Sequence, residues 1–346
     1  MSLSIGIVGL PNVGKSTLFN ALTKKSVPAE NYPFCTIDPS VGIIAVPDER
    51  LEKLNEFSKS RKKIPAVIEF VDIAGLVRGA SKGEGKGNDF LQHIRECDAI
   101  AEMVRIFNDP EILHVEAEVN PLRDIETINL ELVLADLQTV TKRLGSLGKE
   151  VKKGDKDALL EKNTLEKVAK VLEEGKFAIE AFAPTREPVG EPTENVGLKN
   201  AQLLTMKPIL YILNTSEAAE EVSQAKELLS GKNSIVGNNF VSIDPIFEKG
   251  LNDLIKKAYE TLNLITFFTT GEDETRGWTI KRNSTAPVAG MAIHTDFRDK
   301  FIRAEVIEWD KLLQAGSYAA AREKGWLRTE GKEYIVKDGD VVEFKI

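Results

Sequence analysis

Two patterns of hydrophobic and polar positions occur along this chain, and each predicts a different kind of element. Continuous apolar runs of about four to eight residues indicate strands buried on both faces, as in a parallel sheet. A helix-compatible run, Ser16–Thr23, follows the first of these strands, and a further helix is predicted at Leu251–Leu262. The alternation of strands with helical segments predicts an α/β fold with a doubly wound sheet. The predicted strands are Leu3–Val8, Val41–Val46, Val67–Val71, Ile100–Ile106, Pro208–Leu213 and Asn239–Ile243.

The stretch from Arg123 to Ala181 has the second pattern. Leucine and valine recur there at the three- and four-residue spacing of an amphipathic helix, first over residues 130–144 and again over residues 159–172. Gly145–Gly148 and Gly154–Asp155 lie between the two series. The pattern predicts two antiparallel helices that form a projecting hairpin, in an inserted domain at residues 123–199.

From residue 264 onwards the pattern becomes that of short strands separated by turns, which predicts a separate small domain at residues 264–346. His294, Thr295 and Asp296 lie together in it, and we interpret them as a turn network because no nucleophile stands out nearby. The predicted strands are Trp278–Lys281, Phe301–Ile307, Gly331–Val336 and, after a turn, the segment ending at Phe344.

Composition narrows the class of protein. The chain has 346 residues and a net charge of −8, so no global positive field attracts nucleic acid, and an RNA contact would need a local patch. Its two cysteines, Cys35 and Cys97, argue against a disulfide scaffold or a structural zinc site and favour a reducing compartment. No apolar segment approaches the ~20 residues of a membrane span, and the chain leads directly into its first strand. We therefore expect a cytoplasmic protein.

The strongest chemical signal is Gly9–Thr17, which fits the phosphate-binding pattern G-x-x-x-x-G-K-[ST] between a strand and a helix. Its backbone N–H groups and the helix N-terminus would surround an anion. Lys15 would reach the β- and γ-phosphates, and Ser16 would offer its hydroxyl to Mg²⁺. Asn12, Val13, Gly14 and Thr17 complete the predicted phosphate contacts. The alternative, a glycine turn with an incidental lysine, is disfavoured by the flanking strand and helix.

Two later positions complete the predicted phosphate and metal site. Thr36 lies in a proline-containing loop, where its hydroxyl could bind Mg²⁺; the alternative is a plain surface loop. Asp72 and Gly75 form D-x-x-G at a strand end, where the Asp would reach Mg²⁺ through water and the Gly N–H would meet the γ-phosphate. A glycine-rich segment, residues 79–87, follows and suits a segment that orders around that phosphate.

These motifs together resemble the Obg-like ATPase family of the YchF type. The resemblance rests on Gly9–Thr17, Tyr32–Thr36, Asp72–Gly85, Ile94–Ile100 and Val119–Ile128, and it resumes at the C-terminus. It implies a P-loop nucleotide-binding domain at residues 1–122 and 200–263, an inserted helical hairpin, and a C-terminal TGS domain with a β-grasp fold. It also implies contact with the ribosome, with the large subunit as the expected partner.

The base-binding segment departs from the guanine pattern. GTPases carry Asn-x-x-Asp at this strand end, where the Asp accepts two N–H bonds from guanine. This chain has Asn214 and Glu217, a change that the family resemblance shares and that implies adenine. Ser242, on the next strand, is the remaining predicted base contact. We therefore predict ATP binding with weaker GTP binding; a guanine-specific GTPase is the alternative.

The hydrolytic group is less evident. Leu76 stands where many related GTPases place a water-orienting Gln. His114 is the candidate general base, alongside Lys15 and Gly75 in the catalytic set; the alternative is a loop histidine without a chemical role. The family pattern has a His near Glu102, where this chain has Glu. Asn12 could also hold K⁺, as an Asn does in some P-loop proteins.

A cluster of positive charge marks the hairpin tip, formed by Lys142, Arg143, Lys149, Lys152, Lys153 and Lys156 against Glu150 and Asp155. It predicts either an RNA contact or a solvated helix end. Two functions follow from the whole sequence. The first is a Mg²⁺-dependent ATPase that is slow without a partner and acts as a ribosome-associated switch. The second is a nucleotide-gated RNA- or ribosome-binding module whose hydrolysis is incidental.

Overall fold

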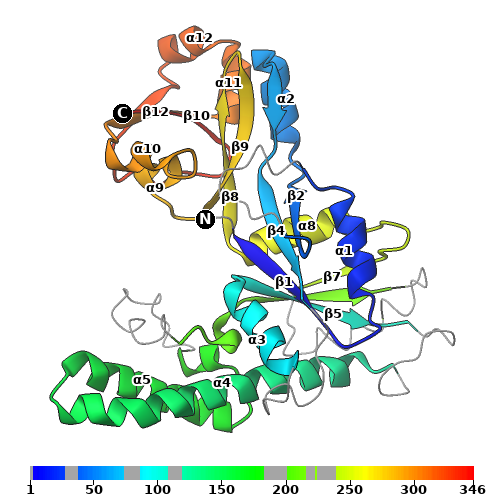
Figure 1. Ribbon diagram of the computed structural model, residues 1–346. Helices are drawn as coiled ribbons and strands as arrows, with labels where there is room; N and C mark the ends of the chain where they lie inside the picture. The colour runs from blue at the N-terminus through cyan, green and yellow to red at the C-terminus, as the bar shows by residue number, and fades with distance from the viewer. Residues whose placement is uncertain are drawn as a thin grey trace. The chain divides into compact units, whose positions relative to one another are not determined.

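A computed structural model describes residues 3–27, 38–73, 86–107, 119–182, 201–215, 223 and 239–346. The predicted α/β class is confirmed (Figure 1). The chain divides into two compact units. The hairpin unit comprises Gly6–Ser16 and Asp72–Asp244, and the C-terminal unit comprises Met1–Ile5, Thr17–Val71 and Pro245–Ile346. In the described part of the chain, no helix is long and apolar enough to cross a membrane.

The hairpin unit contains a parallel sheet built from the predicted apolar runs. β5 (Ala99–Arg105) pairs with β6 (Ile209–Asn214), and β6 pairs with β7 (Phe240–Ile243), all in parallel. β1 (Ser4–Val8) is the neighbour of β5 on its other side. All residues of β5 are buried, because helices cover both faces of such a sheet. The carboxyl ends of these strands therefore meet at one edge, where a ligand is expected.

Two long helices form the predicted hairpin, α4 (Pro121–Lys152) and α5 (Lys156–Glu173), which lie side by side (Figure 1). Asn120 caps α4, with its side chain accepting from Arg123 N, and Pro121 occupies the first turn. Asp155 caps α5 in the same way. The hairpin core consists of Val133, Val140 and Leu147 from α4 with Leu165, Val168 and Leu172 from α5.

Of the two glycine-containing segments predicted between the helices, Gly145–Gly148 does not interrupt the first helix, because α4 continues through both glycines to Lys152. A mid-helix glycine costs about 1 kcal/mol relative to alanine. Leu147, between the two glycines, is fully buried against α5, and Val151 packs on the same core. This tertiary packing outweighs the local cost. The connection is made instead at Gly154, whose φ of 85° lies in the left-handed region that glycine favours.

The C-terminal unit contains the second sheet, of order β11-β10-β12-β8-β9-β3. Its central strands, β8 and β12, are parallel, and their outer neighbours are antiparallel to them, as in the predicted β-grasp. Its strands are β3 (Lys62–Ile64), β8 (Leu264–Thr270), β9 (Glu274–Lys281), β10 (Arg303–Glu308), β11 (Arg328–Glu330) and β12 (Asp340–Lys345).

Two predictions for this sheet can be judged against the structure. The strand predicted at Gly331–Val336 is wrong: Tyr334 N bonds to Gly331 O in a turn, and only Ile335 forms an isolated bridge, to Thr285. The nearby strand is β11 instead. The interpretation of His294–Asp296 as a turn network is confirmed, since His294 Nδ1 accepts from Asp296 N at 3.2 Å and caps α10 (Thr295–Asp299).

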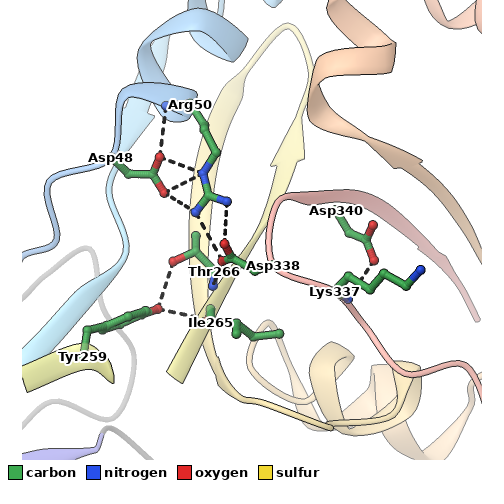
Figure 2. Close-up of polar contacts among 8 residues, drawn as sticks. All are labelled: Asp48, Arg50, Tyr259, Ile265, Thr266, Lys337, Asp338 and Asp340. Carbon is green, nitrogen blue, oxygen red and sulfur yellow. Dashed lines mark hydrogen bonds and ion pairs between the residues drawn. The ribbon is translucent and has the colours of Figure 1, made fainter. Parts of the chain in front are cut away.

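A segment from the first part of the chain joins this C-terminal sheet. α2 (Glu49–Ser58) packs Leu51 and Leu54 against Phe268 and Leu312, and β3 pairs in parallel with β9. Arg50 fixes the helix in place by bonding both Asp48, its N-cap, and Asp338 (Figure 2). The other elements of this unit are β2 (Val41–Ala45), α8 (Leu251–Thr261), α9 (Ala286–Gly290), α11 (Trp309–Ala315), α12 (Tyr318–Glu323) and β4 (Val67–Asp72), whose last residue belongs to the hairpin unit.

Candidate functional site

The predicted phosphate loop leaves β1 after Val8 and enters α1 (Lys15–Thr23), so the strand–loop–helix context is confirmed. Two glycines are required by close approach. A Cβ on Gly9 would lie 2.6 Å from the carbonyl oxygen of Met103, and one on Gly14 would lie 2.5 Å from Asn214 Nδ2. Gly14 also has a φ of 100°. The loop therefore lies directly against the carboxyl ends of β5 and β6, where no side chain would fit.

Lys15 is the charged residue of this loop, and its surroundings shift its pKa. Its Nζ donates to the carbonyl oxygens of Gly9 and Leu10, both at 2.9 Å. Burial lowers its pKa from 10.5 to about 8, although Asp72 opposes this change. No carboxylate of the described residues lies within ion-pair distance of Nζ. The amine thus remains directed at the loop by neutral acceptors, which an anionic ligand could replace.

Asp72 is the last residue of β4, and Ile73 N donates to Ile7 O just beyond it. Burial raises the pKa of this half-buried carboxyl, and the Lys15 ammonium acts in the opposite direction. The two groups are therefore close enough to influence each other, as a phosphate-binding lysine and a metal-binding aspartate would be. Ser16 and Thr17 follow Lys15 in the first turn of α1, and both are exposed.

Asn214 has a structural contact that the sequence does not show. Its buried Nδ2 donates to Val13 O at 2.8 Å, so the amide ties the end of β6 to the phosphate loop. Ser242 lies opposite Leu213 in the register of β6 and β7, at the same end of the sheet. Its Oγ is buried and has no hydrogen-bond partner among the described residues. The structure thus brings Asn214 to the loop and leaves Ser242 Oγ available for a ligand.

Several predicted site residues lie outside the described residues. These are Thr36, Gly75, His114 and Glu217, together with Leu76. Their assignments as metal ligand, phosphate contact, general base and base contact stay predictions. The three-domain division and the role of Asn12 in K⁺ binding stay predictions as well.

The basic tip of the hairpin is only partly available to a partner. Arg143 bonds Glu161 at 2.7 Å and Glu150 at 3.3 Å, so its charge is neutralised within the hairpin. The remaining lysines are exposed and form no ion pair with a described carboxylate: Lys142, Lys149, Lys152, Lys153 and Lys156. The tip therefore keeps clustered positive charge on exposed side chains, as a phosphate-binding surface requires.

Two family models match the chain. One is described as "50S ribosome-binding GTPase" and matches residues 4–139, and the other is described as "Protein of unknown function (DUF933)" and matches residues 264–346. The first contains the phosphate loop, β5 and the start of α4. The second begins at the first residue of β8 and ends with the chain.

Similar proteins extend over almost the whole chain. "Ribosome-binding ATPase YchF" of Bacillus subtilis (strain 168) is 47% identical over 370 residues, covering 100% of this chain and 99% of that protein. "Obg-like ATPase 1" of Oryza sativa subsp. japonica is 41% identical, covering 99% of this chain and 92% of that protein. A solved structure, "Structure of the Schizosaccharomyces pombe YchF GTPase", matches with a TM-score of 0.82 at 37% identity, covering 99% of this chain and 98% of that one.

Proposed function

The chain belongs to the YchF type of Obg-like ATPases, and on that premise we propose that it is a Mg²⁺-dependent nucleoside triphosphatase that hydrolyses ATP in preference to GTP. The observation that carries the proposal is the Lys15 amine, held inside the loop by the carbonyls of Gly9 and Leu10. The β- and γ-phosphates would replace these neutral acceptors with charged ones and raise the pKa of Lys15 again.

Mg²⁺ fits the donors at this site. It prefers oxygen ligands, keeps several waters, and is usually held by one or two carboxylates together with substrate phosphates. The Ser16 hydroxyl and the Asp72 carboxylate are such donors, and no described group of three or more His, Cys, Asp or Glu side chains offers an all-protein cage. The bound ion would neutralise charge on the phosphates. Ser16 and Asp72 would orient it, with Thr36 as a further ligand.

The preference for adenine rests on Glu217, which replaces the Asp that binds guanine. Adenine offers no matching pair of donors, so a carboxylate placed for guanine brings no gain. Asn214 supports the loop, which leaves Ser242 Oγ as the described polar group for the base. The alternative is guanine specificity, since one similar structure is called a GTPase. Competitive binding of ATP and GTP to wild type and to Glu217→Asp tests this, with a shift toward GTP expected for the variant.

We propose His114 as the group that activates the attacking water, because the Leu76 side chain cannot hydrogen-bond to that water. A general base contributes typically ~10²–10⁴-fold to the rate. His114→Ala should therefore lower phosphate release without weakening ATP binding, whereas His93→Ala, which changes an exposed residue of α3 (Lys86–Glu96), should leave both unchanged. Equal turnover in all three proteins would favour the second function, a nucleotide-gated binding module with incidental hydrolysis.

Faster turnover in K⁺ than in Na⁺ would support a K⁺ site at Asn12.

The proposed partner is the ribosome in the cytoplasm, most directly its large subunit, because the similar proteins carry ribosome-binding names. The lysines of the hairpin tip would contact RNA phosphates, so binding should weaken steeply with salt. Lys152→Glu with Lys153→Glu should reduce co-sedimentation with ribosomes. Lys167→Glu with Lys170→Glu, an equal charge change more than 15 Å along α5 by the ~1.5 Å rise per residue, is the matched control. If both variants sediment like wild type at every salt concentration, the tip is a solvated helix end.

A further inference from the structure

The β-grasp sheet of the C-terminal unit contains a cavity of about 510 Å³ that the proposed ATPase function does not use. Aromatic side chains line one part of it, and carboxylates line another. The lining residues that matter here are Trp278, Phe297, Tyr318, Glu274, Glu305 and Glu343, and the basic side chain of Arg322 lies beside them in the lining. The volume lies within the ~300–1,000 Å³ of typical ligand pockets.

The cavity lies where the two central strands of this sheet stop pairing. β8 and β12 share the single register pair Val341↔Phe268, whereas β10 and β12 are paired from Arg303 to Glu308 and β8 and β9 are paired along all of β8. The residues that follow this pair on both strands, including Thr270 and Glu343, line the cavity. The opening is therefore part of the sheet's construction, and it places side chains from both strands around one space.

Two of the lining carboxylates are placed at a cost to the fold. Glu305 and Glu343 are direct partners in the antiparallel register of β10 and β12. Like charges directly opposite each other destabilise a sheet. Arg322 bonds Glu305 at 2.9 Å and Lys345 bonds Glu343, but the side chain of Arg322 is 66% exposed. Glu305 itself is only 16% exposed, and the third glutamate, Glu274, lies 3.9 Å from Arg276. Ion pairs with one partly exposed partner are weak, so a ligand cation can compete for these carboxylates.

The aromatic wall of the cavity is suited to a guanidinium or ammonium group. Arg276 already occupies one face of the Trp278 ring, 4.0 Å from its centroid, which shows that a guanidinium is stable beside this wall, and the Phe297 and Tyr318 rings form the rest of the wall. Tyr318 bonds Thr270 O through its hydroxyl, and burial together with the Glu343 carboxylate raises the pKa of that phenol. Carboxylates and aromatic rings thus line the same cavity.

We propose that this cavity is a docking site for a basic polypeptide segment of a partner protein, whose arginine or lysine side chains enter between the aromatic wall and the glutamates. A segment fits better than a free small cation because the carboxylates are spread out. Glu274 lies on β9 and Glu343 on β12, two strands apart in the sheet and thus about 10 Å from each other at ~4.8 Å per strand. An extended chain spans that distance in about three residues.

The test uses the full chain and a fluorescent 12-residue peptide with arginine at every third position, followed by anisotropy at low salt. The matched peptide replaces each arginine with citrulline, which keeps the shape and removes the charge. We expect the arginine peptide to bind and the citrulline peptide to bind at least tenfold more weakly. Glu305→Gln with Glu343→Gln should weaken the arginine peptide at least tenfold. This variant should not unfold, because it removes two opposed like charges.

The control variant is Glu323→Gln with Glu333→Gln, two exposed carboxylates of the same unit that do not line the cavity. It makes the same charge change and should bind the peptide within twofold of wild type. Equal losses in both variants, or equal binding of the citrulline peptide, would overturn the proposal. So would competition by spermine as effective as that by the unlabelled peptide, because the occupant would then be a small polyamine. Phosphate release from ATP, measured in parallel, should be unchanged in both variants, which separates this result from the proposed ATPase function.

Discussion

Lys15 and Arg50 are both partly buried basic residues, and they differ in the charge of the groups that they contact. Among the described residues, Lys15 bonds two neutral carbonyls of its own loop, and burial lowers its pKa. Burial also opposes the charge of Arg50, but hydrogen bonds to Asp48 and Asp338 raise its pKa (Figure 2). The Arg50 charge is neutralised by two carboxylates in direct contact, whereas in the described part of the chain no carboxylate lies within ion-pair distance of Lys15 Nζ. A buried cation without a buried counter-ion marks a site for an anionic ligand, and one with two counter-ions marks a structural contact.

The largest expected effect concerns Lys15. Lys15→Ala should weaken ATP binding by about 100-fold, because removing one partner of a buried charged hydrogen bond costs about 3 kcal/mol. The free energy of unfolding without nucleotide should change by less than about 1 kcal/mol, since no carboxylate of the described residues lies within ion-pair distance of Lys15 Nζ and would lose a direct partner. Isothermal titration with ATP and a urea melt of the same samples measure both. A large loss of stability with normal binding would reverse the comparison.

Arg50→Met should do the opposite. It leaves Asp48 and Asp338 without their shared cation, and it should lower the free energy of unfolding by about 2–3 kcal/mol, less than for a fully buried pair because Asp338 is partly exposed. ATP binding should be unchanged. Arg61→Met is the control, because Arg61 and its partner Asp273 are both over 80% exposed and 3.5 Å apart. If the control loses as much stability as Arg50→Met, the Arg50 contacts have no special role.

Glu102 is a buried acidic residue that can be compared with the basic residues Lys15 and Arg50. It is fully buried on β5, and neither carboxylate oxygen has a hydrogen-bond partner among the residues that the structure describes. Burial raises its pKa well above 4.5, and Asp124 adds to the effect. The folded protein therefore binds this proton more tightly than the unfolded chain does, so the stability contributed by the neutral form is lost as the pH rises through the raised pKa.

Glu102→Gln removes that titration. We expect the variant to be more stable than wild type at pH 8 by about 1 kcal/mol, and to show a flatter decline of stability between pH 5 and 8. Urea melts across this pH range measure it, with the exposed Glu126→Gln as control. A variant with the same pH slope as wild type would show that Glu102 is charged in the fold.

The phosphate loop could be predicted from the sequence because its chemistry is local. Nine consecutive residues between a strand and a helix specify the turn, the anion contacts and the lysine. The strands of the parallel sheet were predictable for a similar reason, since burial on both faces makes each one a continuous apolar run.

The attachment of α2 and β3 to the C-terminal sheet could not be predicted in this way. β3 has only three residues, two of them exposed lysines, and it pairs with residues 274–276, more than 200 positions away. Asn214 shows the same limit at the site: its bond to Val13 O depends on how β6 and the loop meet in space. Such contacts are decided by tertiary packing, which leaves no periodic signal in the chain.

The central claim is that this chain hydrolyses ATP in preference to GTP at the Lys15 and Asp72 site. The most direct measurement is phosphate release by the full chain from ATP and from GTP, run in parallel with Mg²⁺ and with EDTA. We predict faster release from ATP than from GTP, and none with EDTA. Release from GTP as fast as or faster than from ATP, or unchanged release in EDTA, would contradict the claim.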